Sequence, residues 1–87
     1  MYEIVFTKQA QKDKKLLKQA GLDKRTKALL DVIAENPFKN PPRYEKLVGD
    51  LAGYYSRRIN VQHRLVYQVY EELKTVKVLS MWTHYEF

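Results

Sequence analysis

Apolar and β-branched residues gather near the two ends of the chain and leave a helical pattern between them. Residues 2–6 form one short β-branched and aromatic run, which is typical of a strand. Three more runs of this kind follow in close succession at residues 54–60, 63–70 and 75–82, and short polar turns separate them. We therefore predict one strand near the start of the chain and an antiparallel three-stranded meander near its end.

Two helices are predicted between the first strand and the meander. Thr7 is placed to cap a helix that continues to residue 19 or 20, and Gly21 supplies its left-handed stop. Asp23 is the expected N-cap of the second helix, which Pro37 ends. The first helix is rich in lysine, and its narrow apolar stripe consists of Ala10, Leu16, Leu17 and Ala20. The second helix shows the i, i+4, i+7, i+8 and i+11 spacing of a buried face: Leu22, Thr26, Leu29, Leu30 and Ile33.

This order of elements predicts an α+β fold in which both helices pack on one face of a sheet. Residues 36–42 contain three prolines and two asparagines. They are expected to form a loop within one domain, because neither side of the chain is long enough to fold alone. We therefore expect a single domain over residues 1–87, with the second face of the sheet free for function.

The chain is strongly basic, which narrows the kinds of partner that suit it. It contains 16 lysine and arginine residues against 10 acidic residues, so its formal net charge is +6 and its estimated pI is about 9.6. An anionic partner is favoured, and both nucleic acid and an acidic protein fit this charge. With 87 residues the core is modest, and a large enclosed active site is not expected.

Several classes of chemistry are excluded by composition. Cysteine is absent, which rules out disulfides, thiolate nucleophiles and zinc-thiolate sites. The two histidines and the acidic residues show no metal-ligand spacing, so we expect no metal and no cofactor. The start of the chain lacks a basic leader and a cleavage site, and no apolar run is long enough to span a bilayer. We expect a soluble, cytoplasmic protein with no membrane association.

Arginines on the predicted meander are candidates for phosphate contacts. Side chains alternate along a strand, so Arg64 should point away from Leu65 and Tyr67 and therefore away from the helix-packed core. Arg57 and Arg58 are adjacent, so at most one of them lines the free face while the other snorkels or pairs at the rim. The alternation leaves open whether these guanidinium groups contact phosphate or pair with an acidic side chain at the edge.

A metal-free cleavage of RNA needs a base for the 2′-hydroxyl, a cation for the phosphorus centre and an acid for the leaving oxygen. Glu45, Arg64 and His84 supply these three types of group. His84 is preferred as the acid because it lies near an exposed terminus, whereas the position of His63 at a turn explains that residue without a function. From spacing alone, other acidic residues are equally available as the base: Glu3, Glu35, Asp50, Glu71, Glu72 and Glu86.

A more specific signal comes from the order of short motifs in the second half of the chain. They are Glu45-Lys46-Leu47, the run from Leu51 to Ile59 that contains Tyr54-Tyr55-Ser56-Arg57-Arg58, the segment His63-Arg64-Leu65-Val66-Tyr67, and a closing His84-Tyr85. This pattern resembles the YoeB/Txe family of RelE-like toxins. The resemblance implies the toxin half of a toxin-antitoxin module, an endoribonuclease that cuts messenger RNA in the ribosomal A site.

Roles for individual residues follow from the resemblance. It implies that Glu45 is the general base, Arg64 the stabiliser of the phosphorane and His84 the general acid. The product would be a 2′,3′-cyclic phosphate and a free 5′-hydroxyl. Residues implied as RNA-binding or supporting are Arg58, Tyr85, Lys46 and Arg57. The implied partners are a cognate acidic antitoxin, messenger RNA and the ribosome with its ribosomal RNA, and dimerisation of the toxin stays open.

Two other classes of function stay open from the sequence. RelE-like folds also include toxins that block gyrase by protein contact, and the fold alone does not separate the two classes. The Glu45, Arg64 and His84 set favours catalysis, because a protein-binding toxin does not need it. A non-catalytic RNA-binding module would instead use stacking platforms, for which the candidates are Tyr54, Tyr55, Tyr67, Tyr70 and Trp82.

Overall fold

The structure is a computed structural model that describes residues 1–82, and residues 83–87 lie outside the description. Its elements follow one another as β1 (Glu3–Phe6), α1 (Lys8–Gln19), α2 (Asp23–Glu35), β2 (Tyr44–Lys46), the short 3-10 helix η1 (Gly49–Leu51), β3 (Tyr54–Arg58), β4 (Arg64–Tyr70) and β5 (Thr75–Ser80). The predicted first strand, two helices and final three strands are all present in the predicted order, and β2 is an additional strand between α2 and β3. Within residues 1–82, no helix is both long enough and apolar enough to cross a membrane.

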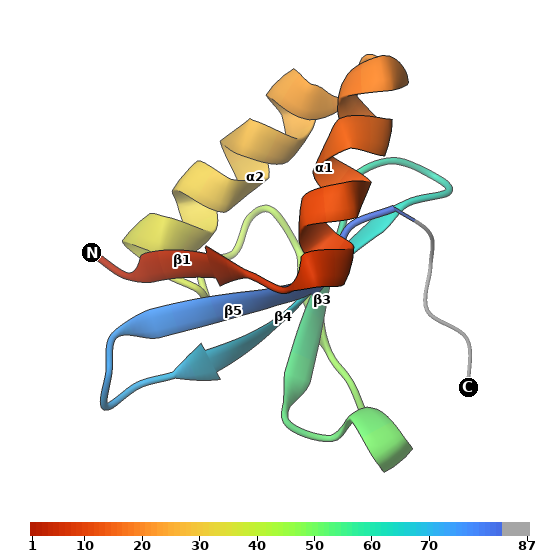
Figure 1. Cartoon of the computed structure of the whole chain (residues 1–87). Coiled ribbons are helices and arrows are strands. Elements are labelled where there is room, and N and C mark those ends of the chain that lie inside the picture. The colour runs from red at the N-terminus through yellow and green to blue at the C-terminus, as the bar shows by residue number, and fades with distance from the viewer. Residues whose placement is uncertain (83–87) are drawn as a thin grey trace.

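One mixed sheet joins the strands in the order β1-β5-β4-β3-β2. Its centre is the predicted antiparallel meander of β3, β4 and β5. The first strand, β1, pairs in parallel with the last strand, β5, and β2 adds to β3 in antiparallel direction. Both α-helices lie over the same face of this sheet (Figure 1). The α+β prediction is therefore confirmed, and the sheet is wider than the predicted meander.

Strand β2 was not predicted from the sequence. It consists of three residues that follow the proline-rich loop, which is too short a stretch for an alternating pattern of apolar and polar side chains to stand out. Its identity as a strand comes from its partner: Tyr44, Glu45 and Lys46 are registered opposite Arg57, Ser56 and Tyr55 of β3.

The predicted boundaries of α1 are confirmed by hydrogen bonds at its two ends. The Thr7 hydroxyl accepts from the Ala10 N–H at 3.1 Å and donates to the Leu79 carbonyl at 2.7 Å, so this cap also joins the helix to β5. At the other end, Gly21 has a positive φ of 74°, and the Leu22 N–H reaches back to the Leu17 carbonyl at 2.8 Å. This is the Schellman arrangement, which favours glycine at the left-handed position.

The expected N-cap of α2 is wrong by one residue. Leu22, and not Asp23, occupies the N-cap position, and its side chain makes no capping hydrogen bond. The Leu22 carbonyl already accepts from the Thr26 N–H at 3.0 Å, so the helical hydrogen bonds of α2 begin at Leu22, directly after the Schellman turn. Asp23 then lies in the first turn, where its negative charge suits the positive end of the helix dipole.

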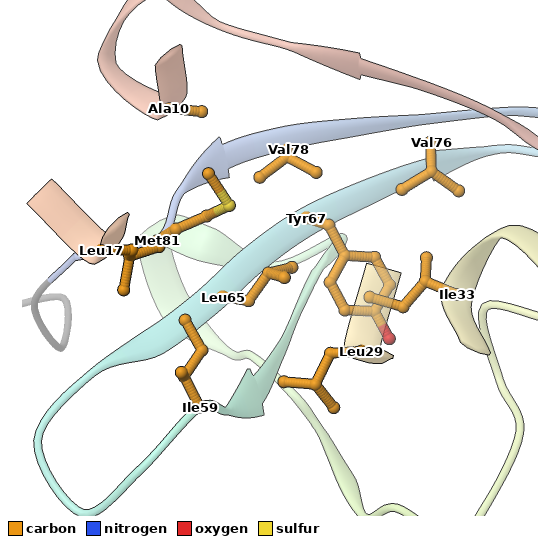
Figure 2. Close-up of a cluster of buried hydrophobic side chains, with 10 residues drawn as sticks. All are labelled: Ala10, Leu17, Leu29, Ile33, Ile59, Leu65, Tyr67, Val76, Val78 and Met81. Carbon is orange, nitrogen blue, oxygen red and sulfur yellow. The ribbon is translucent and has the colours of Figure 1, made fainter. Parts of the chain in front are cut away.

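The hydrophobic core lies between the two helices and the sheet (Figure 2). The α2 face that contributes to it was predicted correctly, since Thr26, Leu29 and Ile33 are buried and Leu22 and Leu30 are partly buried. The sheet contributes side chains that alternate toward the helices. The buried hydrophobic side chains of this cluster are Ala10, Leu17, Leu29, Ile33, Ile59, Leu65, Tyr67, Val76, Val78 and Met81.

The stripe of α1 that faces the core contains an acidic residue. Asp13 is buried between Ala10 and Leu17 on this face, whereas the expected stripe members Leu16 and Ala20 are exposed. One Asp13 oxygen accepts from the Met81 N–H at 2.9 Å, and the other accepts from the Gln9 side chain at 2.9 Å. The carboxylate thus satisfies a backbone donor just beyond the end of β5, a role that a hydrophobicity pattern does not reveal.

A buried arginine fixes the loop that leads to β2. Arg57 is 1% exposed and faces the helix-packed side of the sheet. The expectation that the arginine turned away from the free face would snorkel or pair at the rim is therefore wrong. Its guanidinium donates to the carbonyls of Pro37, Lys39 and Pro42, at 3.0, 2.9 and 2.5 Å, and to the Tyr67 hydroxyl at 3.1 Å. Loop residues 36–42 are therefore folded around a single cation.

The Tyr67 hydroxyl completes this arrangement. It accepts from Arg57 and donates to the Pro37 carbonyl at 2.8 Å. Burial raises the pKa of Tyr67 above its usual value of 10.0, against the lowering influence of the Arg57 charge. The phenol therefore keeps the proton that it donates to the loop.

We predict that Arg57→Lys lowers the free energy of unfolding by about 2 to 3 kcal/mol, because an ammonium cannot reproduce the fork that serves several oxygens. Urea unfolding at neutral pH measures the loss. The matched control is Arg58→Lys, an exposed neighbour on the other face, whose unfolding free energy should stay within about 0.5 kcal/mol of the parent. Equal losses in the two variants would contradict the role assigned to Arg57.

Candidate functional site

Charged and polar side chains line the sheet face that lies opposite the helices. Leu65 and Tyr67 belong to the core, so the alternation along β4 turns Arg64 to the other face, as predicted. Arg58 is registered directly opposite Arg64 across β3 and β4. One step along the sheet, Glu45 of β2 is registered opposite Ser56 of β3. Neighbouring strands therefore bring residues that are far apart in the chain to one place.

These side chains surround a cleft with a volume of about 230 Å³. Arg43, which directly precedes β2, completes it. Since Tyr44 is registered opposite Arg57, the residue before Tyr44 comes next to Arg58 at the end of the same pair of strands. The cleft is lined by Arg43, Glu45, Ser56, Arg58 and Arg64.

Glu45 and Arg64 form the ion pair of the cleft. Arg64 Nη1 lies 3.4 Å from Glu45 Oε1, and the two side chains are 20% and 42% exposed, respectively. A single long contact of this kind, partly open to solvent, contributes at most about 1 kcal/mol to stability. It leaves a second carboxylate oxygen and further guanidinium donors available to a ligand.

The balance of charge in the cleft favours an anion. Three guanidinium groups line it beside one carboxylate. Arg58 and Arg64 are direct cross-strand neighbours, and like charges in that relation repel each other. An oxyanion placed between them would relieve this repulsion and accept the planar, paired donors of arginine.

Two of the residues expected at the site lie elsewhere. Arg57 is buried on the helix side of the sheet, where its guanidinium donates to loop carbonyls, and it does not line the cleft. Lys46 is exposed, but it follows Glu45 on β2 and so faces the opposite side of the strand, registered against Tyr55. His84 and Tyr85 lie outside the described residues.

Two residues of the cleft were missed in the sequence. Ser56 shares the strand parity of Arg58, which was visible, but a serine carries no distinctive motif. Arg43 lies two residues before Glu45, and this relation becomes informative only once β2 is known to be a strand. These two residues could not be assigned to the cleft from the sequence because β2 was not predicted as a strand.

His63 is buried at the turn before β4, where its backbone N–H donates to the Asn60 side chain at 2.6 Å and its carbonyl accepts from the Ile59 N–H at 2.9 Å. Its imidazole stacks on the Trp82 indole, with ring centroids 4.1 Å apart and an angle of 19° between the planes. Trp82 is the last described residue, and Ser80 before it is registered opposite Val66 of β4. The described chain therefore ends beside the start of β4, where Arg64 lies.

Within residues 1–82, no group of three His, Asp or Glu side chains gathers closely enough to hold a metal ion. The chemistry available in the described part of the cleft is therefore that of one carboxylate, three guanidinium groups and one hydroxyl. Such a set can bind an oxyanion and accept a proton next to it.

Solved toxin structures share this arrangement of strands and helices. The YoeB/ParE toxin from Agrobacterium tumefaciens superposes with a TM-score of 0.87 and 30% identity, over 95% of this chain and 99% of that one. The YoeB dimer from Staphylococcus aureus gives a TM-score of 0.81 and 39% identity, over 97% and 98% of the two chains. A YoeB-YefM complex from the same organism matches with a TM-score of 0.81 and 39% identity, over 98% and 99%. The fold is that of the RelE-like toxins.

Sequence comparison then gives the family within this class. A family model described as the YoeB-like toxin of the bacterial type II toxin-antitoxin system matches residues 6–85. Toxin YoeB of Synechocystis is 41% identical over 76 residues, which amount to 87% of this chain and 79% of that protein. This chain belongs to the YoeB-like toxins of bacterial type II toxin-antitoxin systems. The resemblance seen in the motifs is confirmed.

Because Arg58 opposes another arginine, we predict that Arg58→Gln leaves the free energy of unfolding unchanged or raises it by about 0.5 kcal/mol. Urea unfolding at low ionic strength, where the repulsion is least screened, measures this effect. In the control Arg25→Gln, the lost hydrogen bond to the Ile59 carbonyl should lower stability by about 0.5 kcal/mol. A loss above about 1 kcal/mol in Arg58→Gln would mean that Arg58 has a stabilising partner.

Proposed function

We propose that this chain is a toxin endoribonuclease that cleaves messenger RNA by attack of the RNA's own 2′-oxygen, without a metal ion. The observation that carries the proposal is the placement of Glu45 against Arg64 in a cleft that two further arginines line. Membership of the YoeB-like toxins supports the same reading. The combination provides a proton acceptor next to a site for a phosphate.

In the proposed reaction, Glu45 takes the proton from the 2′-hydroxyl while the 2′-oxygen forms a bond to the adjacent phosphorus. Its 42% exposure leaves the carboxylate accessible to a substrate in the cleft. Arg64 donates to the phosphate oxygens as negative charge grows on them, and Arg58 does so from the facing strand. The 3.4 Å contact between Glu45 and Arg64 keeps the base and the cation close enough to act on the same phosphate group.

The bond from phosphorus to the 5′-oxygen breaks in the same reaction, and that oxygen needs a proton. We assign this role to His84, as the family resemblance implies, with Tyr85 as a supporting RNA contact. Asp13 and His63 support the assignment indirectly, because they hold Met81 and Trp82 at the end of β5, on the side of the sheet where β4 begins with Arg64. The products are a 2′,3′-cyclic phosphate and a free 5′-hydroxyl.

The proposed cellular setting follows from charge and family. The substrate is messenger RNA in the ribosomal A site, and the basic surface of the toxin, with a net charge of +6, docks on ribosomal RNA. A cognate acidic antitoxin binds the same basic protein in the cytoplasm and holds it inactive. The YoeB-YefM complex from Staphylococcus aureus is a relative in such an assembly.

We predict that Glu45→Gln and His84→Gln each reduce cleavage by about 10²- to 10⁴-fold and leave the fold intact, because each variant loses one proton transfer. The measurement uses antitoxin-free protein with ribosomes programmed with end-labelled messenger RNA, beside naked RNA, and maps the cut and its 3′ end. Glu72→Gln, an exposed acid in the turn after β4, is the matched control and should cleave like the parent.

Cleavage that survives in both variants would contradict the catalytic roles. Intact RNA with the parent protein, despite growth arrest in cells, would instead support a toxin of the same fold that blocks a protein target such as gyrase. Catalysis requires Glu45 and His84, whereas blocking a protein target does not, so these measurements separate the two classes of toxin.

Arg64→Lys keeps the positive charge but loses the planar pair of donors, so we predict that its cleavage rate falls by about 10- to 100-fold. The same ribosome assay, run in single turnover with toxin in excess, measures the rate of the chemical step. An unchanged rate in this variant would show that Arg64 acts only as a point charge.

A further inference from the structure

The Ser56 hydroxyl is an unusual group in this cleft. Its residue is 0% exposed, and its oxygen has no hydrogen-bond partner among the described residues. A buried hydroxyl without a partner destabilises the folded state, so such groups in native proteins call for an explanation. Serine is also a poor choice for the middle of a sheet on packing grounds alone, because its side chain fills little space.

The position of Ser56 relates it to the other residues of the cleft. It is registered opposite Glu45 on one side and opposite Val66 on the other. Arg58 lies two residues further along the same strand and therefore on the same face. Ser56 thus lies between Glu45, the proposed base, and the buried Val66, and it is two residues along β3 from the facing pair Arg58 and Arg64.

The arginines of the cleft differ in their partners. Arg64 pairs with Glu45, whereas Arg43 and Arg58 are exposed and form no ion pair within residues 1–82. Two guanidinium groups and one hydroxyl donor therefore face the cleft without an acceptor from the described chain. An anion that carries several oxygen acceptors would satisfy all three at once.

We propose that Ser56, Arg43 and Arg58 form a subsite for a phosphodiester of the RNA substrate, in which the Ser56 hydroxyl donates to a non-bridging phosphate oxygen. The inference rests on the proposed function and extends it, because it adds Ser56 and Arg43 to the residues that bind the phosphate next to Glu45. Arg64 is then free to act on the charge that develops during the reaction. The unpartnered hydroxyl is explained as a donor kept ready for the ligand.

This subsite makes a prediction that a purely structural serine would not meet. In Ser56→Ala the affinity for RNA should fall by about tenfold, because one hydrogen bond to a charged oxygen is lost. The same variant should be as stable as the parent or more stable, because no hydrogen bond of the described protein is broken. Arg43→Gln should also lose about tenfold in affinity, with little change in stability.

The test uses a short RNA in which every 2′-oxygen carries a methyl group, so that it binds but cannot be cleaved. Fluorescence anisotropy gives its dissociation constant for the parent, Ser56→Ala and Arg43→Gln, and urea unfolding gives their stability. Lys15→Ala removes one exposed charge from α1 and is the control for net charge, with an expected change in affinity below about threefold. Inorganic phosphate should compete with the RNA for the parent and compete less well for Ser56→Ala.

The outcomes separate this inference from the proposed function. If the parent protein cleaves RNA on ribosomes but Ser56→Ala binds the methylated RNA as tightly as the parent, the subsite is wrong and the nuclease assignment stands. If the methylated RNA binds with the expected dependence on Ser56 and Arg43 but unmodified RNA stays intact, the subsite stands and the nuclease assignment fails. A Ser56→Ala variant that loses both affinity and stability would also overturn the inference, since the serine would then be structural.

Discussion

The buried guanidinium of Arg57 is the interaction on which the functional face of this protein depends. A cation in the core is tolerated only when its donors are satisfied, and here three loop carbonyls and the Tyr67 hydroxyl satisfy them. These hydrogen bonds hold loop residues 36–42 against β3, so the chain enters β2 at a defined position. Because Arg57 faces the helices, Ser56 and Arg58 on either side of it must face the cleft.

In the cleft, by contrast, several polar groups lack hydrogen-bond or ion-pair partners among the described residues. Arg58 and Arg64 repel each other across β3 and β4, and the Ser56 hydroxyl has no partner among the described residues. Features of this kind lower stability and persist where they serve a ligand. Arg57, adjacent in sequence to both Ser56 and Arg58, differs because each of its three guanidinium nitrogens has an acceptor. This contrast separates the structural arginine of the sheet from the arginines for which we propose a role in the cleft.

Several parts of this structure were predictable because the forces behind them act over a few residues. The Thr7 cap, the Gly21 stop and the buried stripe of α2 depend on local hydrogen bonds and helical spacing. The orientation of Arg64 followed in the same way from strand alternation. The burial of Asp13 and the stacking of His63 were not predictable in this way, since their partners Met81 and Trp82 are far away in sequence and become neighbours only when the distant segments of the chain pack together.

The sequence by itself determined the two helices, the first strand and the meander, the α+β class, the family and several of the ionisable residues that line the cleft. The tertiary structure alone decided that β1 lies beside β5, that Tyr44–Lys46 is a strand, and that Arg43 and Ser56 join Glu45, Arg58 and Arg64 around one cleft. The physical reason is that propensity and periodicity act between near neighbours in the chain. Strand pairing and the burial of a charge depend on contacts between distant segments, which exist only once the whole sheet has formed.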